Sequence, residues 1–296
     1  MSANKTSANQ CGQRIKLKSS RRFIVDYLYF CKKVPSQPIS RDCDVQGLVE
    51  LRKKSLQRIG WTSLMLKAIA HLADREPELR YSYMKWPWGH LYLHSHQVGN
   101  VAVSRKVDEE DVLIFHRIEK PESMSLLEIQ ESIYQAQSQP LEKNRLFQTR
   151  LKFCRIPWFF RRVIWWFALN ISGKVKTSMT GTVGITSVAA CGANSIHPPT
   201  LGNLVITYGP VQSDGTVRIT FVYDHRVLDG LAVARYLEQF ESILNDIVAK
   251  ELQTLSKTPA AVMGKFSRFP MPRTRVDELS GKPEISSFKH RQTKME

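Results

Sequence analysis

Apolar side chains recur every three to four residues in several stretches of the chain, and this spacing predicts amphipathic helices. Ser125 and Glu128 form a capping-box pattern at the start of one helix, and Thr62 is expected to cap another that ends before Pro77. The expected helices cover residues 21–33, 45–56 and 62–76, and two more begin at Ser125 and Gly230.

Alternation of apolar and polar residues predicts the strands, and Asp214-Gly215 marks a hairpin turn between the last two. Strands are expected at residues 38–45, 81–86, 90–96, 98–103, 112–118, 182–188, 204–208 and 217–223. Helices and strands come in groups rather than in strict alternation. This order predicts an α/β sandwich (α+β) with a mixed β-sheet flanked by helices, not a Rossmann arrangement.

The composition is typical of a globular protein with one main folded unit. The chain has 296 residues, of which 42% are hydrophobic and 24% are charged, enough for a large core. Residues 20–252 are expected to form the folded domain. The segments 1–19 and 253–296 are basic and lack periodicity, so they are expected to be disordered tails.

The net charge of +16 is concentrated in three segments. Residues 1–35 hold eight Lys and Arg against one acid, residues 143–176 hold nine against none, and residues 256–296 hold nine against four. The rest of the chain is therefore slightly acidic. This distribution argues against a basic nucleic-acid-binding body, and no specific nucleic-acid partner is expected.

Residues 140–176 are unusual because the apolar, Trp-rich run 156–169 within them is interrupted by Arg161 and Arg162. The run is too short and too charged to span a bilayer. It would lie either on an anionic membrane surface, with snorkelling arginines, or buried in the protein or against a second subunit. Because the run is apolar nearly all round, burial is favoured and only a weak anionic membrane contact is expected.

Five scattered cysteines, odd in number and without a Cys-x-x-Cys pair, predict free thiols rather than disulfides or a zinc site. The first twenty residues have no apolar core of the kind found in secretory signals. Both observations favour a reducing compartment, so a cytoplasmic protein is expected.

Three histidines, His90, His94 and His96, lie close together in the chain. On a strand His94 and His96 would share a face, as metal ligands often do. No acidic residue or cysteine lies nearby in the sequence, so surface or channel-lining histidines are expected rather than a metal site.

His225 is the residue best suited to catalysis. It follows an alternating strand and precedes Asp229 by four residues, where the chain enters a helix at Gly230. A side chain at such a strand end projects into a cleft, and histidine titrates near neutral pH, as a general base requires. Asp229 is placed to cap the helix or to pair with an arginine. The spacing alone is equally compatible with a surface histidine beside a helix cap.

The run Asp-His-Arg-Val-Leu-Asp-Gly at 224–230 resembles the signature of the catalytic domain of dihydrolipoyl acyltransferases from 2-oxo acid dehydrogenase complexes. More distantly, it resembles chloramphenicol acetyltransferase. Further similarities occur in the family's order over residues 20–250, namely the opening helix with Pro35, residues 42–52, 98–118, 125–129 and 181–188, and His197-Pro198-Pro199. The resemblance implies a chloramphenicol acetyltransferase-like fold.

The resemblance also implies an acyltransferase that moves an acyl group between a CoA thioester and a thiol, hydroxyl or amine acceptor. His225 would be the general base, and Thr186 would donate a hydrogen bond to the tetrahedral oxyanion. Asp229 would orient the His225 loop through an ion pair with an arginine of the first helix. The supporting residues are Ser187 (the alternative to Thr186), Arg226, Gly230, Arg21 and Arg22.

In this family the histidine and the hydroxyl meet across a subunit interface, which implies a homotrimer with acyl-CoA or CoA and a second acceptor as substrates and no tightly bound cofactor. The sequence departs from the family in lacking an upstream lipoyl attachment domain and peripheral-subunit-binding domain. Segment 140–176 is also not the usual linker, and the loop from Thr186 to His225 is shorter. A free-standing relative is therefore expected, the alternative being a catalytically inactive trimeric scaffold associated with a membrane surface.

Overall fold

The computed structural model describes residues 12–257, except residues 56 and 108–109. Most of the two predicted tails therefore lies outside the described residues. The first helix, α1 (Ser19–Cys31), begins where the folded domain was expected to begin. The last, α9 (Ala249–Lys257), continues past the predicted boundary at 252 because Leu252 and Leu255 pack against the core.

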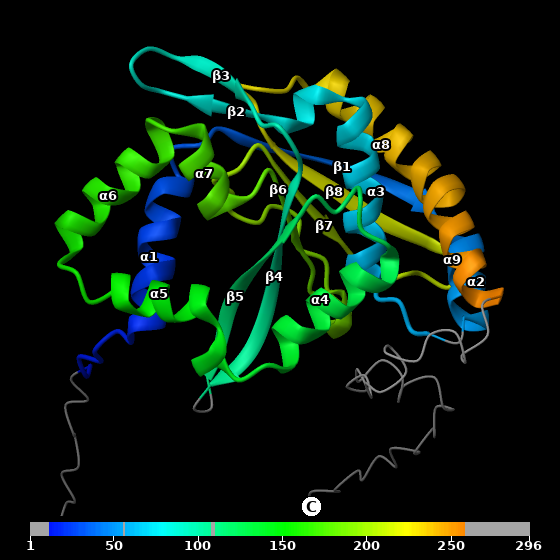
Figure 1. Cartoon of the computed structure of the whole chain (residues 1–296), viewed down its shortest axis with the longest axis horizontal. Coiled ribbons are helices and arrows are strands. Elements are labelled where there is room, and N and C mark those ends of the chain that lie inside the picture. Colours follow the sequence, from blue (N-terminus) through cyan, green and yellow to red (C-terminus); the bar gives the residue numbers. More distant parts are fainter. Residues whose placement is uncertain (1–11, 56, 108–109, 258–296) are drawn as a thin grey trace, which may run out of the picture.

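A mixed six-stranded sheet in the order β1-β8-β7-β6-β4-β5 forms the centre of the molecule (Figure 1). β6 runs parallel to both β4 and β7, and the other neighbours are antiparallel. The strands are β1 (Ser36–Asp44), β4 (Val98–Val107), β5 (Glu110–Glu119), β6 (Val183–Thr186), β7 (Leu204–Tyr208) and β8 (Thr216–Asp224), and a separate hairpin pairs β2 (Tyr81–Met84) with β3 (His90–Leu93). The predicted fold class is confirmed.

One face of the sheet carries the main core. Alternate strand residues such as Ile185 and Phe221 point into it, and the Phe221 ring lies 5.3 Å from that of Phe240. The predicted capping box of Ser125 and Glu128 is present. The helical elements on this side are α2 (Gln46–Lys54), α3 (Trp61–Arg75), α4 (Leu126–Ser138), α8 (Gly230–Ile243), the π-turn η4 (Leu244–Val248) and α9.

The predicted cap of α3 is wrong. The helix begins at Trp61 with Gly60 in the N-cap position, and no side chain caps it. The Thr62 hydroxyl instead shares a hydrogen bond of 2.7 Å with the hydroxyl of Tyr208 on β7. Since Tyr208 is buried, its hydroxyl needs a partner, and this tertiary bond outweighs the local capping pattern.

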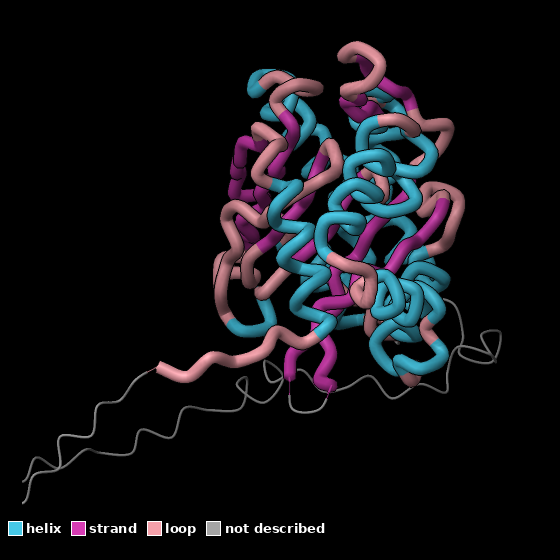
Figure 2. The backbone as a smooth tube through the Cα atoms, turned by 90° about the vertical axis from the view of Figure 1, so that its left-hand side faces the viewer, coloured by secondary structure: helices cyan, strands magenta, loops and turns pink. Residues whose placement is uncertain are grey.

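A second layer of helices lies on the opposite side, in front of the strands in Figure 2. It contains α1, α5 (Arg145–Phe153), α6 (Trp158–Asn170) and α7 (Gly173–Thr180). Short 3₁₀ turns occur elsewhere along the chain at η1 (Pro77–Arg80), η2 (Leu141–Lys143) and η3 (Ala189–Cys191). Trp165 and Leu169 of α6 pack with Phe30 of α1 in a separate apolar cluster. Within the described residues, no helix combines the length and apolar character needed to cross a membrane.

The run 156–169 is buried on one face only. Arg161 is buried and pairs with Asp26 of α1, with 2.5 Å between Nε and Oδ2. Most of the remaining aromatic side chains point to solvent. The expectation of burial therefore holds for the face toward α1 and fails for the other, because within this chain α6 contacts one layer rather than two.

Candidate active site

His225 follows directly after β8, in a loop that leads into α8. Its backbone N–H donates to the carbonyl oxygen of Pro35 at 3.1 Å, which ties the loop to the segment between α1 and β1. Its ring lies 5.5 Å from that of Tyr223, and 47% of its side chain is exposed. The structure therefore anchors the backbone of His225 and leaves its imidazole accessible to a substrate.

Asp229 lies beside His225 rather than beside an arginine. The distance from Nδ1 of His225 to an Asp229 carboxylate oxygen is 3.8 Å, too long for a hydrogen bond, and Asp229 is 89% exposed. Asp229 occupies the N-cap position of α8, but its side chain makes no capping bond. Gly230 begins the helix close to Tyr223, whose hydroxyl oxygen would lie 3.3 Å from an added Cβ.

The hypothesis that Asp229 pairs with Arg21 or Arg22 is not supported within one chain. His225 is held by Pro35, just beyond the C-terminal end of α1. Arg21 and Arg22 precede the last residue of α1 by about ten residues, which is on the order of 15 Å along the helix axis. Among the described residues, neither forms an ion pair with Asp229.

The His225 loop is braced by an ion pair between a buried carboxylate and a partly exposed guanidinium, a contact that the sequence pattern did not predict. Asp224 is buried and accepts two hydrogen bonds from the Arg226 guanidinium, at 2.8 and 2.6 Å. The guanidinium carbon lies 4.3 Å from the centre of the Tyr83 ring. Lys176 donates to the Tyr83 carbonyl at 2.9 Å, and its burial lowers its pKa to about 8. The motif residues flanking His225 thus fix its loop to β2 and α7.

Thr186 ends β6 and is half-buried on the sheet face opposite the main core. In the part of the chain that the structure describes, its hydroxyl has no hydrogen-bond partner. Ser187 differs, because its hydroxyl donates to the Tyr208 carbonyl at 2.8 Å and accepts from the N–H of Ala189 at 3.1 Å. Of the two candidate donors, Thr186 is the one whose hydroxyl is available.

Thr186 lines a pocket of about 630 Å³, a volume that includes its open mouth, between the sheet and α1. Several polar groups in the wall already bond within the protein: Tyr27 donates to Pro199, Asn100 to Thr180 and Thr200 to Gly202. The rest of the lining is mainly apolar and includes Ala102, Leu113, Phe115, Leu201 and Val205. Among the described residues, the Thr186 hydroxyl is therefore left without a hydrogen-bond partner in a mainly apolar cavity.

His225 and Thr186 do not meet within one chain. On β7, Leu204 pairs with Tyr223, two residues before His225. Thr207 of the same strand pairs with Thr186 on one side and with Thr220 on the other. His225 therefore lies five residues beyond the level of Thr186, roughly 16 Å along the strands and roughly 10 Å across two strand spacings. A reaction that uses both groups requires a second chain.

Solved structures with this fold come from acyltransferase cores. The cubic core of the pyruvate dehydrogenase multienzyme complex matches with a TM-score of 0.59 and 18% identity, over 84% of this chain and 98% of that chain. The chain has the fold of dihydrolipoamide acetyltransferase catalytic cores. That of Azotobacter vinelandii matches with a TM-score of 0.59 and 17% identity over the same shares, and a probable one from Listeria monocytogenes with 0.56 and 15% over 83% and 96%.

No family model matches the sequence, and no curated protein matches it. The similarity to the acetyltransferase cores at 15–18% identity establishes the arrangement of strands and helices. It does not by itself assign a reaction, so the residues at His225 and Thr186 carry the functional argument.

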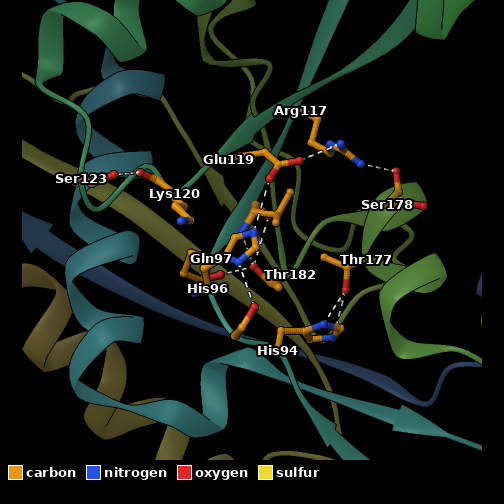
Figure 3. A network of polar contacts seen from close by, with 12 residues as sticks. His94, His96, Gln97, Arg117, Glu119, Lys120, Ser123, Thr177, Ser178 and Thr182 are labelled. Carbon is orange, nitrogen blue, oxygen red and sulfur yellow. Dashed lines mark hydrogen bonds and ion pairs between the residues drawn. The ribbon is translucent and has the colours of Figure 1, made fainter.

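The three neighbouring histidines lie in different surroundings: His94 is buried, whereas His90 and His96 are at least partly exposed. Among the described residues, no group of three His, Cys, Asp or Glu side chains is arranged to hold a metal ion. His94 is buried, not on the surface, and its ring bonds to the Ser82 hydroxyl at 2.9 Å. The ring also bonds to the Thr177 hydroxyl at 2.5 Å (Figure 3). β3 ends at Leu93, so His94 and His96 lie outside the strand on which they were expected to share a face.

Acid is expected to destabilise the protein through His94. Burial lowers the pKa of His94 from about 6.5 to about 4. As pH falls from 6.5 to 4, the unfolded chain takes up this proton first, so the free energy of unfolding decreases, by up to about 3 kcal/mol. Urea unfolding at pH 7 and pH 4.5 should show a smaller difference for His94→Asn than for wild type. His96→Asn, at a part-exposed site, should behave like wild type, and equal pH dependence in all three proteins would contradict the assignment.

Proposed function

We propose that the protein is an acyltransferase that moves an acyl group between a CoA thioester and a thiol, hydroxyl or amine acceptor. The observation that carries this proposal is that one acetyltransferase-core fold presents both an accessible histidine at a braced strand end and a free hydroxyl in a mainly apolar pocket. His225 is the general base, and Thr186 is the oxyanion donor. The described cysteines are free thiols, which agrees with a reducing cytoplasm.

The chemistry assigned to each group is simple. The imidazole of His225 takes the proton of the acceptor as its sulfur, oxygen or nitrogen attacks the thioester carbonyl. The carbonyl oxygen becomes an oxyanion and accepts the hydrogen bond of the Thr186 hydroxyl. The intermediate then collapses, the carbon–sulfur bond breaks, and the imidazolium returns the proton to the CoA thiolate. The apolar pocket beside Thr186 suits the hydrocarbon part of the acyl group.

The site forms between subunits of a homotrimer in this proposal, because one chain holds the two groups too far apart. One observation on a similar protein supports the assembly, and another supports the catalytic residues. The pyruvate dehydrogenase structure is the cubic core of a multienzyme complex. In the A. vinelandii enzyme, a serine, a histidine and an asparagine four residues after that histidine were investigated for their role in catalysis, and Asp229 follows His225 by the same interval.

The activity is tested by release of free CoA thiol from a series of acyl-CoAs, from acetyl to long-chain, with dihydrolipoamide as the acceptor. We expect acceptor-dependent thiol release with at least one donor. Mass spectrometry should identify the acyl thioester of dihydrolipoamide as the product, rather than a mixed disulfide. Absence of release with every donor would favour a scaffold of the same fold. The exposed apolar face of α6 is the specific observation that supports this second candidate, a non-catalytic trimer at a membrane surface.

A shared site makes two inactive variants complementary. His225→Ala and Thr186→Ala should each be inactive alone. When co-expressed in equal amounts, random assembly should restore about a quarter of wild-type activity, because some interfaces combine the intact histidine of one subunit with the intact threonine of another. Thiol release by the purified mixture measures the recovery. No recovery from mixed trimers of normal mass would contradict a site shared between subunits.

A further inference from the structure

The outer face of α6 exposes a row of large apolar side chains. The opposite face is well packed on α1 through Trp165 and Leu169, so the helix is fixed and the exposure belongs to the folded state. Between 44% and 63% of each exposed side chain is accessible to solvent, and these residues are Trp158, Phe159, Phe160, Val163, Ile164 and Phe167. Such a row on a soluble protein marks a contact surface.

The β2–β3 hairpin extends this surface. Its turn exposes Trp86 and Trp88, at 51% and 77%. The N–H of Trp86 donates to the carbonyl of Asn170 at 3.2 Å, which joins the turn to the end of α6, and Tyr92 packs against Gly173. Figure 1 shows α6 and the hairpin tip reaching toward the same side of the molecule. The exposed side chains of α6 together with Trp86 and Trp88 are called the aromatic face below.

The segments that form the aromatic face carry basic residues and no acidic ones. The sequence contains no Asp or Glu between Glu142 and Asp214, nor between Glu78 and Asp108, and these intervals include α6 and the hairpin. Asp26, the acid beneath α6, is buried and neutralised by Arg161. The exposed cations on these segments are Lys85, Lys152, Arg155 and Lys174.

We propose that the aromatic face docks on the surface of a bilayer that contains anionic lipids. Tryptophan and phenylalanine beside lysine and arginine are the residues that amphipathic interfacial helices use, with rings among the headgroups and acyl chains and cations near the lipid phosphates. α6 lies in the plane of the interface and the hairpin turn inserts beside it. The aromatic face points away from α1, and therefore away from the pocket that holds Thr186, so docking leaves that pocket uncovered.

Flotation of the full chain with vesicles tests the proposal. Vesicles of phosphatidylcholine and phosphatidylglycerol at 3:1 are compared with pure phosphatidylcholine. We expect wild type to bind the mixed vesicles at least tenfold more tightly than either Trp86→Ser/Trp88→Ser or Trp158→Ser/Phe160→Ser. These substitutions leave every charge unchanged, so the basic tails contribute equally in all proteins. Leu231→Ser, which removes a 67% exposed side chain from α8, is the matched control and should bind like wild type.

A separate experiment uses tryptophan fluorescence to measure insertion of the aromatic face into the bilayer. Brominated lipid should quench wild type and quench Trp86→Ser/Trp88→Ser less, while circular dichroism shows that the variants remain folded. Equal vesicle binding by wild type and both double variants would assign the binding to the tails and overturn the proposal. The proposal would also be overturned if wild type bound no vesicles and the Trp158→Ser/Phe160→Ser variant lost its oligomeric state on gel filtration. Those two results together would identify the aromatic face as a contact between subunits.

Discussion

Replacing His225 by alanine is expected to lower the rate of acyl transfer by about 10²- to 10⁴-fold, the contribution typical of a positioned general base. The loss should appear in kcat, since the imidazole acts on the proton that moves during attack. Stability should change little because 47% of the side chain is exposed and its described side-chain contacts are the long one to Asp229 and the ring contact with Tyr223. The measurement is thiol release at saturating acyl-CoA, with urea unfolding in parallel.

The matched control is His90→Ala, an exposed histidine on β3 that is expected to retain wild-type activity. Thr186→Val tests the other half of the site and should reduce kcat by about 10²- to 10³-fold, whereas Thr186→Ser keeps a hydroxyl and should stay within about tenfold of wild type. Full activity of His225→Ala would exclude it as the base. Equal activity of the valine and serine variants would remove Thr186 from the mechanism.

Asp26→Ala is expected to reduce the free energy of unfolding by about 3–5 kcal/mol, because it leaves the Arg161 guanidinium buried without a counter-charge. Asp26 is 2% exposed and Arg161 is 7% exposed at the side chain. The guanidinium would keep only its bond to the Ile156 carbonyl, at 2.7 Å. Urea unfolding at pH 7 measures the change, and α6 should lose its packing on α1 first.

Two further variants test whether the loss of stability comes from the burial of the ion pair or from breaking any ion pair. Asp42→Ala breaks the Arg218–Asp42 pair, which has the short distance of 2.6 Å but exposures of 59% and 53%, and should cost less than about 1 kcal/mol. Asp26→Leu combined with Arg161→Met removes both charges and should recover most of the loss. Similar losses for Asp26→Ala and Asp42→Ala would show that burial does not set the strength of the α1–α6 pair.

The sequence determined the elements of the sheet and main core well, because those contacts repeat a local pattern. Alternation in 217–223 and helical spacing after Gly230 predicted β8 and α8, and the capping box at Ser125 formed as expected. His225 was placed at a strand end by the same alternation. These predictions succeeded because each depends on residues within a few positions of one another and on one apolar face that must be buried.

Only the tertiary structure decided which polar groups bond to each other. Lys176 joins the His225 loop through Tyr83, and Asp26 meets Arg161 across 135 residues, so no local spacing announces either contact. The same holds for two predictions that were wrong: Thr62 bonds to Tyr208, and His94 bonds to Ser82 and Thr177. Among the described residues of one chain, Asp229 contacts His225 rather than an arginine.

The sequence by itself thus determined the strand and helix pattern, the chemistry available at His225 and the unusual composition of residues 140–176. The tertiary structure decided that, among the described residues, the Thr186 hydroxyl has no hydrogen-bond partner whereas the Ser187 hydroxyl is bonded. It also decided that the two proposed catalytic groups lie at different levels of the sheet and that α6 is buried on one face only. The physical reason is that burial and hydrogen bonding depend on neighbours brought together by folding, and each buried polar group takes whichever partner the packing supplies.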